Sequence, residues 1–391
     1  MQKKFLAAAV AGALAVPTMA VAQSTVQIYG TAQWEQGYID QGNGRPKTDY
    51  NESTGSYIGF RGTENLGGGL TAWFQCETTA DIRAFDQVGL CSRNSGLGFR
   101  GGFGNVWVGR WHTPMSRAIA LGMVGHESTG ILGFSYIHGG SGSASLIGSA
   151  FEHNAGSATR QRFRRREPCL TTYETPRMGG FMLGAAVSCG NAAADGAAVD
   201  GTNNQKPRVW SFAGTFVRGP LSAGLAYERH NDVGTFNSAT APELDDKAWG
   251  ASAAYTFGPV RAGITYMDRK WETATGDVKM KTWTLGAEWT IAGPHQLHIA
   301  YGMTGDSKGS SLTGISPTAQ GGAAAPGSDT GYEAFTIGYQ YAFSKRTTAK
   351  IGYIRMENET NSSALRANNG AVLLGNGQDT DAVALVVRHT F

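Results

Sequence analysis

Past its first residues the chain contains no long apolar run. After residue 22 no stretch reaches the roughly 18 apolar residues of a membrane-spanning helix, so the sequence predicts none. Proline is scarce, at 12 residues, and charged residues make up only 16% of the chain, whereas there are 56 glycines and 10% aromatic residues. Because a closed β-barrel satisfies its backbone polar groups without a long apolar run, this composition favours a membrane barrel.

Motifs for metal binding, cofactor binding and catalysis are missing as well. There is no Cys-x-x-Cys pair and no G-x-S-x-G motif, and "HEST" at His126 lacks the second histidine of a zinc-protease motif. The segment "GLGFRG" (96–101) matches a dinucleotide-binding pattern, but it lies in an alternating strand with no helix after it. We therefore expect no metal, no cofactor and no enzymatic activity. A barrel hydrolase using a loop histidine is kept as an alternative, since a Ser-His-Asp constellation need not be contiguous.

The N-terminus predicts export. Two lysines precede an apolar run that ends near residue 16, and "AVA" (20–22) forms a small-residue cleavage site, so residues 1–22 are expected to be a secretory signal peptide. Residues 23–391 then form the mature domain. Removing the two lysines lowers the formal charge from +3 to +1. Bulk charge this close to zero does not argue for a nucleic-acid partner.

The four cysteines are expected to form disulfides, because their number is even and an exported chain enters an oxidising compartment. Three pairings are open to Cys76, Cys91, Cys169 and Cys189. We favour Cys76 with Cys91 and Cys169 with Cys189, because each pair lies nearly equidistant from an intervening turn or loop. A metal site is the weaker alternative, since no histidine lies at ligand spacing beside them.

One strand–turn–strand plan occurs twice, in "IGFRGTENLGGGLTAWF" (58–74) and "LGFRGGFGNVWVGR" (97–110). In the first copy Ile58 and Phe60 share one face of a strand, while Arg61 lies on the other; Arg100 takes the same place in the second copy. A glycine-rich turn then leads into an aromatic-rich return strand. Each copy therefore predicts a hairpin with an apolar outer face and an arginine on its inner face.

Alternating runs of this kind continue to the C-terminus. They predict sixteen strands near the length of a tilted membrane strand, at roughly 24–37, 52–62, 68–79, 93–102, 104–112, 164–175, 179–190, 207–218, 220–231, 246–257, 259–271, 278–291, 294–304, 332–343, 346–358 and 380–391. Short and long connections alternate between them, as in outer-membrane barrels. We therefore predict an all-β fold, a 16-stranded antiparallel transmembrane β-barrel. Two soluble β-sandwiches are the alternative, but they would not need so many aromatics at strand ends.

Several segments resemble the Gram-negative general diffusion porins, particularly the betaproteobacterial type. They are "STVQIYGTAQ" after the predicted signal, "GFRGTENLGGGLTAWFQCE", "NVWVGRWHTPM" and the C-terminal "VALVVRHTF". The resemblance implies a homotrimer in the outer membrane and a long third loop, here 113–163, folded into the lumen as a constriction. It also implies that the final Phe391 is an assembly signal read by the barrel-assembly machinery.

The strongest charged feature is "TRQRFRRRE" (159–167). Arg162, Arg164 and Arg166 share one parity, and that parity continues to Thr172, which the resemblance places on the pore wall. Three lumen-facing guanidinium groups would concentrate anions. The alternative is that the run lies at the outer rim, where it is solvated or binds lipopolysaccharide phosphates.

Further pore-lining candidates are less directly supported. The resemblance of "VGR" makes Arg110 one, but alternation places it with Val106 and Val108 unless a bulge intervenes. Arg61 and Arg100 point inward close to tight turns, which suggests the inner vestibule. Glu127 and Glu152 are the acids of the presumed third loop, and opposite the wall arginines they would create a transverse field.

The function expected is therefore an outer-membrane porin that passes small hydrophilic solutes and inorganic ions by passive diffusion, with a preference for anions. A substrate-specific channel is the alternative, with Trp111 and loop aromatics forming a stacking track for a sugar or an aromatic acid. The barrel hydrolase is the less favoured third hypothesis.

Overall fold

The computed structural model of the chain describes residues 25–40, 42, 47–53, 55–81, 89–126, 130, 132–133, 163–164, 166–189, 208–231, 245–273, 275–312, 325–362 and 377–391. Within these residues lie one helix, α2 (Pro114–Ala120), and eighteen strands. The strands are β1 (Thr25–Asp40), β2 (Thr48–Glu52), β3 (Tyr57–Gly67), β4 (Leu70–Thr79), β5 (Ser95–Gly101), β6 (Gly104–His112), β7 (Arg166–Glu174), β8 (Phe181–Ser188), β9 (Arg208–Arg218), β10 (Leu221–Asn231), β11 (Asp246–Phe257), β12 (Val260–Thr273), β13 (Gly276–Ala292), β14 (His295–Thr304), β15 (Lys308–Gly309), β16 (Tyr332–Ala342), β17 (Thr347–Asn358) and β18 (Thr380–Thr390).

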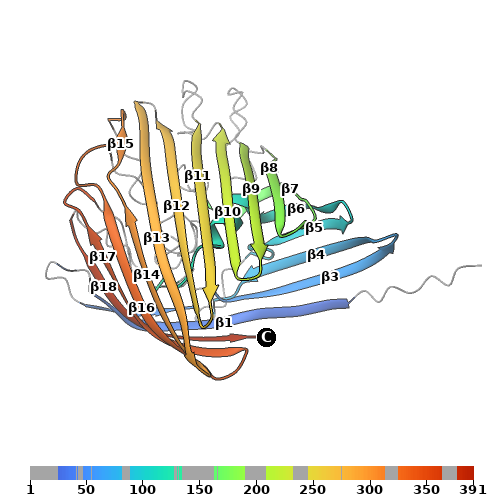
Figure 1. The fold of residues 1–391 in the computed structure, drawn as a ribbon, viewed down its shortest axis with the longest axis horizontal. Coiled ribbons are helices and arrows are strands. Elements are labelled where there is room, and N and C mark those ends of the chain that lie inside the picture. The colour runs from blue at the N-terminus through green and yellow to red at the C-terminus, as the bar shows by residue number, and fades with distance from the viewer. Residues whose placement is uncertain are drawn as a thin grey trace, which may run out of the picture.

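The strands form one antiparallel sheet that closes on itself. β1 pairs with β3 on one side and with β18 on the other, so the first and last strands meet (Figure 1). Each of the sixteen predicted ranges overlaps one strand of this barrel, and the predicted 16-stranded antiparallel barrel is confirmed. The other two, β2 and β15, are short additions that pair with β1 and β13.

The two ends of the barrel differ in how their strands are connected. At one end, here called the turn end, adjacent strands are joined tightly; β9 and β10, for example, are separated only by Gly219 and Pro220. Gly219 has a φ of +56°, which suits the first central position of a two-residue hairpin turn, and the proline that follows needs no backbone N–H. The opposite end, the loop end, carries most of the longer connections. An exception there is β12–β13, whose strands extend until two residues join them.

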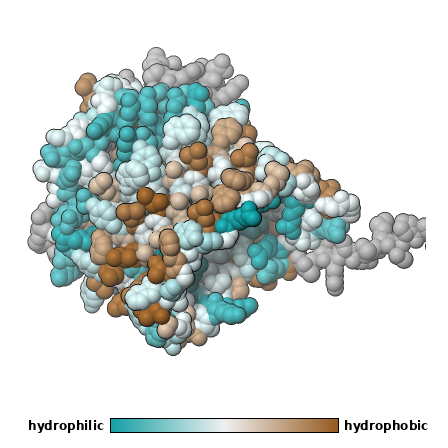
Figure 2. All heavy atoms as spheres, viewed as in Figure 1, coloured by the Kyte–Doolittle hydropathy of each residue, from teal (hydrophilic) through white to brown (hydrophobic). Residues whose placement is uncertain are grey.

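Alternation along the strands gives the barrel an apolar outer face. Large apolar side chains such as Leu225, Leu285 and Ile351 are more than half exposed, and Figure 2 shows a zone of apolar residues across the outside, with hydrophilic residues above it. Exposed tryptophans mark both edges of this zone on β13, at Trp283 and Trp289. Six residues of strand span about 20 Å, close to the apolar band of a membrane barrel. Among the described residues, no helix combines the length and hydropathy needed to cross a bilayer.

Both disulfides form as favoured from the sequence. Cys76 is bonded to Cys91, and Cys169 to Cys189, with Cα–Cα distances of 4.7 and 5.5 Å. Each bridge lies toward the loop end. Cys76–Cys91 closes the connection between β4 and β5, whereas Cys169–Cys189 joins β7 and β8 at the ends opposite their tight turn. The loop end is therefore covalently fastened at two places.

The C-terminal residue belongs to the strand pair that closes the barrel. Phe391 N–H donates to the carbonyl of Gly30 (3.0 Å), and Gly30 N–H donates back to Phe391 (3.1 Å). A side chain at position 30 would collide with the Phe391 ring, because a Cβ there would lie 2.5 Å from it. The terminal phenylalanine thus packs on the first strand.

Candidate functional site

The inner face of the barrel is the candidate site, and part of it is covered by the segment that follows β6. Met115 N–H donates to Ser211 Oγ (3.0 Å), and Ser252 Oγ donates to the carbonyl of Ala118 (2.7 Å), so α2 lies against β9 and β11. Beyond α2, the carbonyl of Leu121 accepts from Arg261 (3.4 Å). Side chains of the barrel wall thereby satisfy three backbone polar groups of this segment.

Small residues on the wall permit this close approach. A Cβ at Gly286 would lie 1.8 Å from the carbonyl oxygen of Val124, and one at Gly263 would lie 2.4 Å from that of Gly122. Further along, Leu132 touches Gly352 on β17. Part of the predicted loop 113–163 thus contacts the inner face on both sides of the barrel. Its role as a constriction stays a prediction, since residues 134–162 lie outside the described residues.

The start of α2 is fixed locally. Thr113 caps the helix, because its hydroxyl accepts from Ser116 N–H (3.3 Å), and Pro114 occupies the first turn, where a missing N–H costs nothing. Arg117 in the last turn pairs with Glu174 of β7. A cation suits a helix C-terminus, and this one also ties the helix to the wall.

A buried charged cluster lies on the loop-end side of α2. Glu228 and His230 of β10 are both fully buried, with Glu228 Oε1 3.0 Å from His230 Nε2, and Phe163 stacks on His230 at 4.5 Å. Arg164 is 6% exposed, and its Nη2 lies 2.7 Å from Met123 Sδ. Burial, with Arg269 nearby, lowers the pKa of Arg164 to about 10. Arg164 therefore packs inside the protein instead of facing open solvent.

A β-bulge in β7 interrupts the alternation expected for the arginine run. Two residues lie between Glu167 and Leu170, whereas the facing stretch of β6 has one, and Cys169 has a φ of +52°. An extra residue turns the side chains beyond it to the other face. Glu167 therefore shares the face of Thr172, and the expected alternation from Arg166 to Thr172 is wrong. Arg166 instead donates from Nε to Asn94 Oδ1 (3.1 Å).

The register of β6 also shows which face of that strand carries Arg110. Its place on the pore wall required a bulge in its own strand, but β6 pairs with β5 without a shift, from Gly104 to Arg110. Trp107 and Trp111 also lie on one face, with ring centroids 6.0 Å apart. The bulge that the assignment requires is in β7 instead, so Arg110 keeps the parity of Val106 and Val108.

The other sequence candidates divide into two groups. Arg61 and Arg100 lie near the turn end, and both are exposed, while their role in lining the pore stays a prediction. Arg61 Nε donates to Gln27 Oε1 (2.9 Å), and its guanidinium lies 4.6 Å from the Tyr29 ring. Three candidates, Arg162, Glu127 and Glu152, lie outside the described residues and stay predictions.

Of the inner tryptophans, Trp107 has no open face for stacking, whereas Trp73 and Trp111 are partly exposed, and the loop aromatics of the stacking alternative lie outside the described residues. Trp73, Trp107 and Trp111 pack against one another in tilted or edge-on contacts of 5.8 to 6.0 Å, and Trp107 is only 2% exposed. A ring buried against its neighbours offers no free face to a solute. No group of three or more metal-binding side chains occurs in the described ranges.

Charged side chains on the inner face vary in exposure: Lys350 and Arg269 are buried, for example, and Glu288 is partly exposed. Glu35, Glu77, Glu228 and Asp246 are each at most 8% exposed. Glu77, for example, accepts from Arg93 Nε (2.9 Å) and from the Tyr29 hydroxyl (3.2 Å). In contrast, a set here called the turn-end cations is exposed, and within the described residues its members form no ion pair: Arg61, Arg100, Lys345, Arg346 and Arg388.

Sequence reasoning did not identify three of the turn-end cations, Lys345, Arg346 and Arg388, although strand alternation could have identified Arg388. Arg388 follows the alternation that places Val387 and Leu385 outward, so it points inward. Lys345 and Arg346 lie in a four-residue connection, where alternation says nothing about direction.

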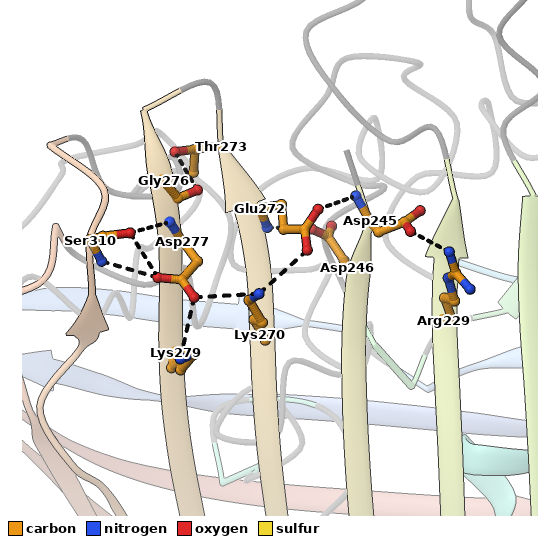
Figure 3. A network of polar contacts seen from close by, with 10 residues as sticks. All are labelled: Arg229, Asp245, Asp246, Lys270, Glu272, Thr273, Gly276, Asp277, Lys279 and Ser310. Atoms are coloured by element: carbon orange, nitrogen blue, oxygen red, sulfur yellow. Dashed lines mark hydrogen bonds and ion pairs between the residues drawn. The ribbon is translucent and has the colours of Figure 1, made fainter. Parts of the chain in front are cut away.

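A second charged zone lies on the outer face at the loop end. It is here called the loop-end network and consists of Arg229, Asp245, Lys270, Glu272, Asp277 and Lys279 (Figure 3). Lys270 Nζ lies 3.4 Å from both Glu272 and Asp277, and Lys279 Nζ lies 3.3 Å from Asp277. Every charge in this zone has an opposite charge beside it.

Comparison with known proteins agrees with this architecture. A family model described as "Gram-negative porin" matches residues 7–361. The chain is 27% identical over 403 residues to "Outer membrane porin protein 32" of Delftia acidovorans, covering all of both chains. It is also 38% identical over 120 residues to "Major outer membrane protein P.IB" of Neisseria meningitidis serogroup B, covering 29% of this chain and 35% of that protein.

Solved structures resemble the barrel over nearly its whole length. "Anion-selective porin from Comamonas acidovorans" superposes with a TM-score of 0.72 at 22% identity, covering 94% of this chain and 100% of that one. The trimer form of OmpT from Vibrio cholerae gives a TM-score of 0.62 at 15% identity, covering 94% and 99%. At these identities the likeness establishes the fold.

Proposed function

The chain belongs to the Gram-negative porin family, and from that premise we propose that it forms a water-filled channel in the outer membrane that passes small hydrophilic solutes and inorganic ions by diffusion, with a preference for anions. The family consists of channels, not enzymes. A closed barrel with an apolar outside and a polar inside suits this role, because lipid contacts the outer face and water the inner one.

The unequal exposure of inner charges carries the anion preference. Solutes in the channel meet the turn-end cations through water, whereas the inner acids Glu35, Glu77, Glu228 and Asp246 are buried, and Glu288, whose side chain is 27% exposed, lies 3.8 Å from His298. Charged side chains that line a pore set its ion selectivity. The name of the Comamonas acidovorans structure, an anion-selective porin, agrees with this proposal.

The remaining expectations form part of the same proposal. Residues 1–22 act as a signal peptide, and residues 23–391 form the barrel, with 113–163 as a constriction loop. The barrels assemble as a homotrimer, which accords with the trimeric neighbour. Phe391, packed on the first strand, is read by the barrel-assembly machinery, and lipopolysaccharide contacts the outside.

Planar-bilayer recording tests the channel and its selectivity together. The conductance of the purified protein is expected to rise linearly with KCl concentration, and a tenfold KCl gradient is expected to give a reversal potential of the sign set by chloride. Lack of conductance would contradict the channel itself. A reversal potential of the cation sign would contradict the anion preference. Conductance that one sugar or aromatic acid blocks saturably would favour the substrate-specific alternative.

A further inference from the structure

We propose that the inner wall carries a binding site for phosphate-bearing anions at the turn end, formed by Lys345, Arg346, Lys350 and Arg388. The site rests on the proposed channel function, since solutes reach it through the lumen. The four cations line one cavity of about 240 Å³, together with Gln33 and Thr348. That volume accommodates inorganic phosphate or the phosphate group of a small ester.

Strand register brings these residues together from the two ends of the chain. Arg388 of β18 lies opposite Thr348 of β17 on one side and opposite Gln33 of β1 on the other. Lys350, two residues from Thr348, shares its face and is 6% exposed. The cavity thus forms only because the barrel closes between its first and last strands.

The turn that carries two of the cations is held in place. Ser344 Oγ accepts from the N–H groups of Arg346 (3.1 Å) and Thr347 (3.0 Å). The carbonyl of Arg346 accepts from Thr390 N–H (2.8 Å), which fastens the turn to the strand of Arg388. The turn backbone is thus fixed relative to the strand of Arg388, which lowers the entropy cost of bringing these cations together on an anion.

The lining contains no carboxylate. Within the described residues Lys345, Arg346 and Arg388 form no ion pair. Glu35, two residues along β1 from Gln33, is fully buried and accepts from Gln33 Nε2 (2.7 Å). The cavity lining therefore carries the side chains of four cations and no carboxylate.

Chemistry favours a multivalent oxyanion over chloride. A phosphate offers several acceptor oxygens, and two guanidinium groups can bind it with paired, charge-assisted hydrogen bonds, while two ammonium groups add charge. Chloride has a single charge and no oxygens to match the planar donors. Four converging cations with amide and hydroxyl groups beside them thus fit a phosphate best.

Along the channel, the site lies on the turn side of the segment that follows β6. Gly352, two residues beyond Lys350 from the turn, is touched by Leu132, so the segment after β6 reaches the wall on the loop side of the cluster. An anion entering from the turn end meets the cluster before this contact, whereas one from the loop end meets it afterwards. Binding is therefore expected to depend on the side of addition.

The test is block of chloride current by inorganic phosphate. The full-length protein in a planar bilayer is recorded while phosphate is added to one side and then to the other. We expect block at lower phosphate concentration from one side, and the variant Arg346→Gln/Arg388→Gln is expected to raise the half-blocking concentration about tenfold. Arg218→Gln is the matched control, since it removes a charge at the turn end from an exposed residue outside the cavity, and it should leave the block unchanged.

Two results would overturn the site while leaving the channel intact: chloride current that phosphate does not block, or equal block in wild type and in the double variant. If the double variant fails to assemble, Lys345→Gln in the exposed turn must still weaken the block, and an unchanged block in that variant overturns the site as well. A protein that conducts no ions overturns the proposed function itself.

Discussion

The loop-end network and the turn-end cations contain the same kinds of residue, but their charges are compensated differently. In the network each lysine or arginine lies within 4 Å of a carboxylate. The turn-end cations are exposed on the inner face and form no ion pair within the described part of the chain. Opposite charges in contact largely cancel at a distance, whereas unpaired charges of one sign produce a field. The two zones thus differ in pairing and in the face they occupy, and the unpaired cations on the inner face are the ones that passing ions meet.

The largest effect on stability is expected where a partner is removed from a buried charge. Glu228→Ala leaves the buried His230 without its carboxylate and removes a negative charge near Arg164. The free energy of unfolding should fall by about 3–5 kcal/mol. Chemical unfolding of the folded protein measures it. Glu64→Ala, at an exposed acid near the turn end, should stay within about 0.5 kcal/mol, and equal losses in both variants would contradict the contrast.

The disulfides lie at the loop end, and removing one of them is expected to lower the stability of the protein. Cys76 and Cys91 are 15 residues apart, so replacing both by serine should lower the free energy of unfolding by about 3 kcal/mol through a less restricted unfolded chain. Unfolding midpoints with and without a reductant measure the effect. A reductant should lower the wild-type midpoint and change the variant less, since one bridge remains. A wild-type midpoint insensitive to a reductant that cleaves both bridges would contradict this expectation.

A third prediction concerns the contact between the segment after β6 and the inner wall of the barrel. Gly286→Ala places a methyl group where Val124 now contacts the wall, and such overpacking costs about 1–3 kcal/mol. Because the segment must move inward, single-channel conductance should also fall. Gly214→Ala is the control, since a Cβ there meets Leu183 at an ordinary 3.5 Å. Wild-type conductance and stability in Gly286→Ala would show that the segment does not rest on this wall.

The smallest effect is expected in the loop-end network. Lys279 is half exposed, and its pairing with Asp277 lies in high dielectric, so Lys279→Gln should cost about 0–1 kcal/mol. Raising the salt concentration should reduce that difference further, because salt screens exposed pairs. A loss well above 1 kcal/mol at physiological salt would mean that the network is a main source of stability.

The fold was predictable because strand alternation is local. The alternation that includes Trp283 and Leu285 predicts the outer face of their strand from its own sequence, without its neighbours. The sixteen strands follow from such patterns. The tight turns were equally readable from glycine and proline. The disulfides followed from spacing along the chain.

The site was less predictable because it depends on register and closure. In "RREPCLTTYE" Pro168 is a local sign of a bulge, but alternation alone does not show the extra residue before Leu170, which separates Arg166 from the face of Thr172. Arg164 looked solvent-exposed in an arginine run, but tertiary packing buries it under Met123. Arg388 and Arg346 come together only because the last strand lies between the first strand and β17.

The most direct test of the account compares reversal potentials under a tenfold KCl gradient for wild type and two triple variants. Arg61→Gln/Arg100→Gln/Arg388→Gln removes turn-end cations, and Arg229→Gln/Lys270→Gln/Lys279→Gln removes the same charge from the loop-end network. We predict a chloride-selective potential for wild type, a shift toward zero in the first variant, and the wild-type value in the second. A wild-type potential in the first variant, or an equal shift in both, would contradict the claim that exposed inner cations set the selectivity.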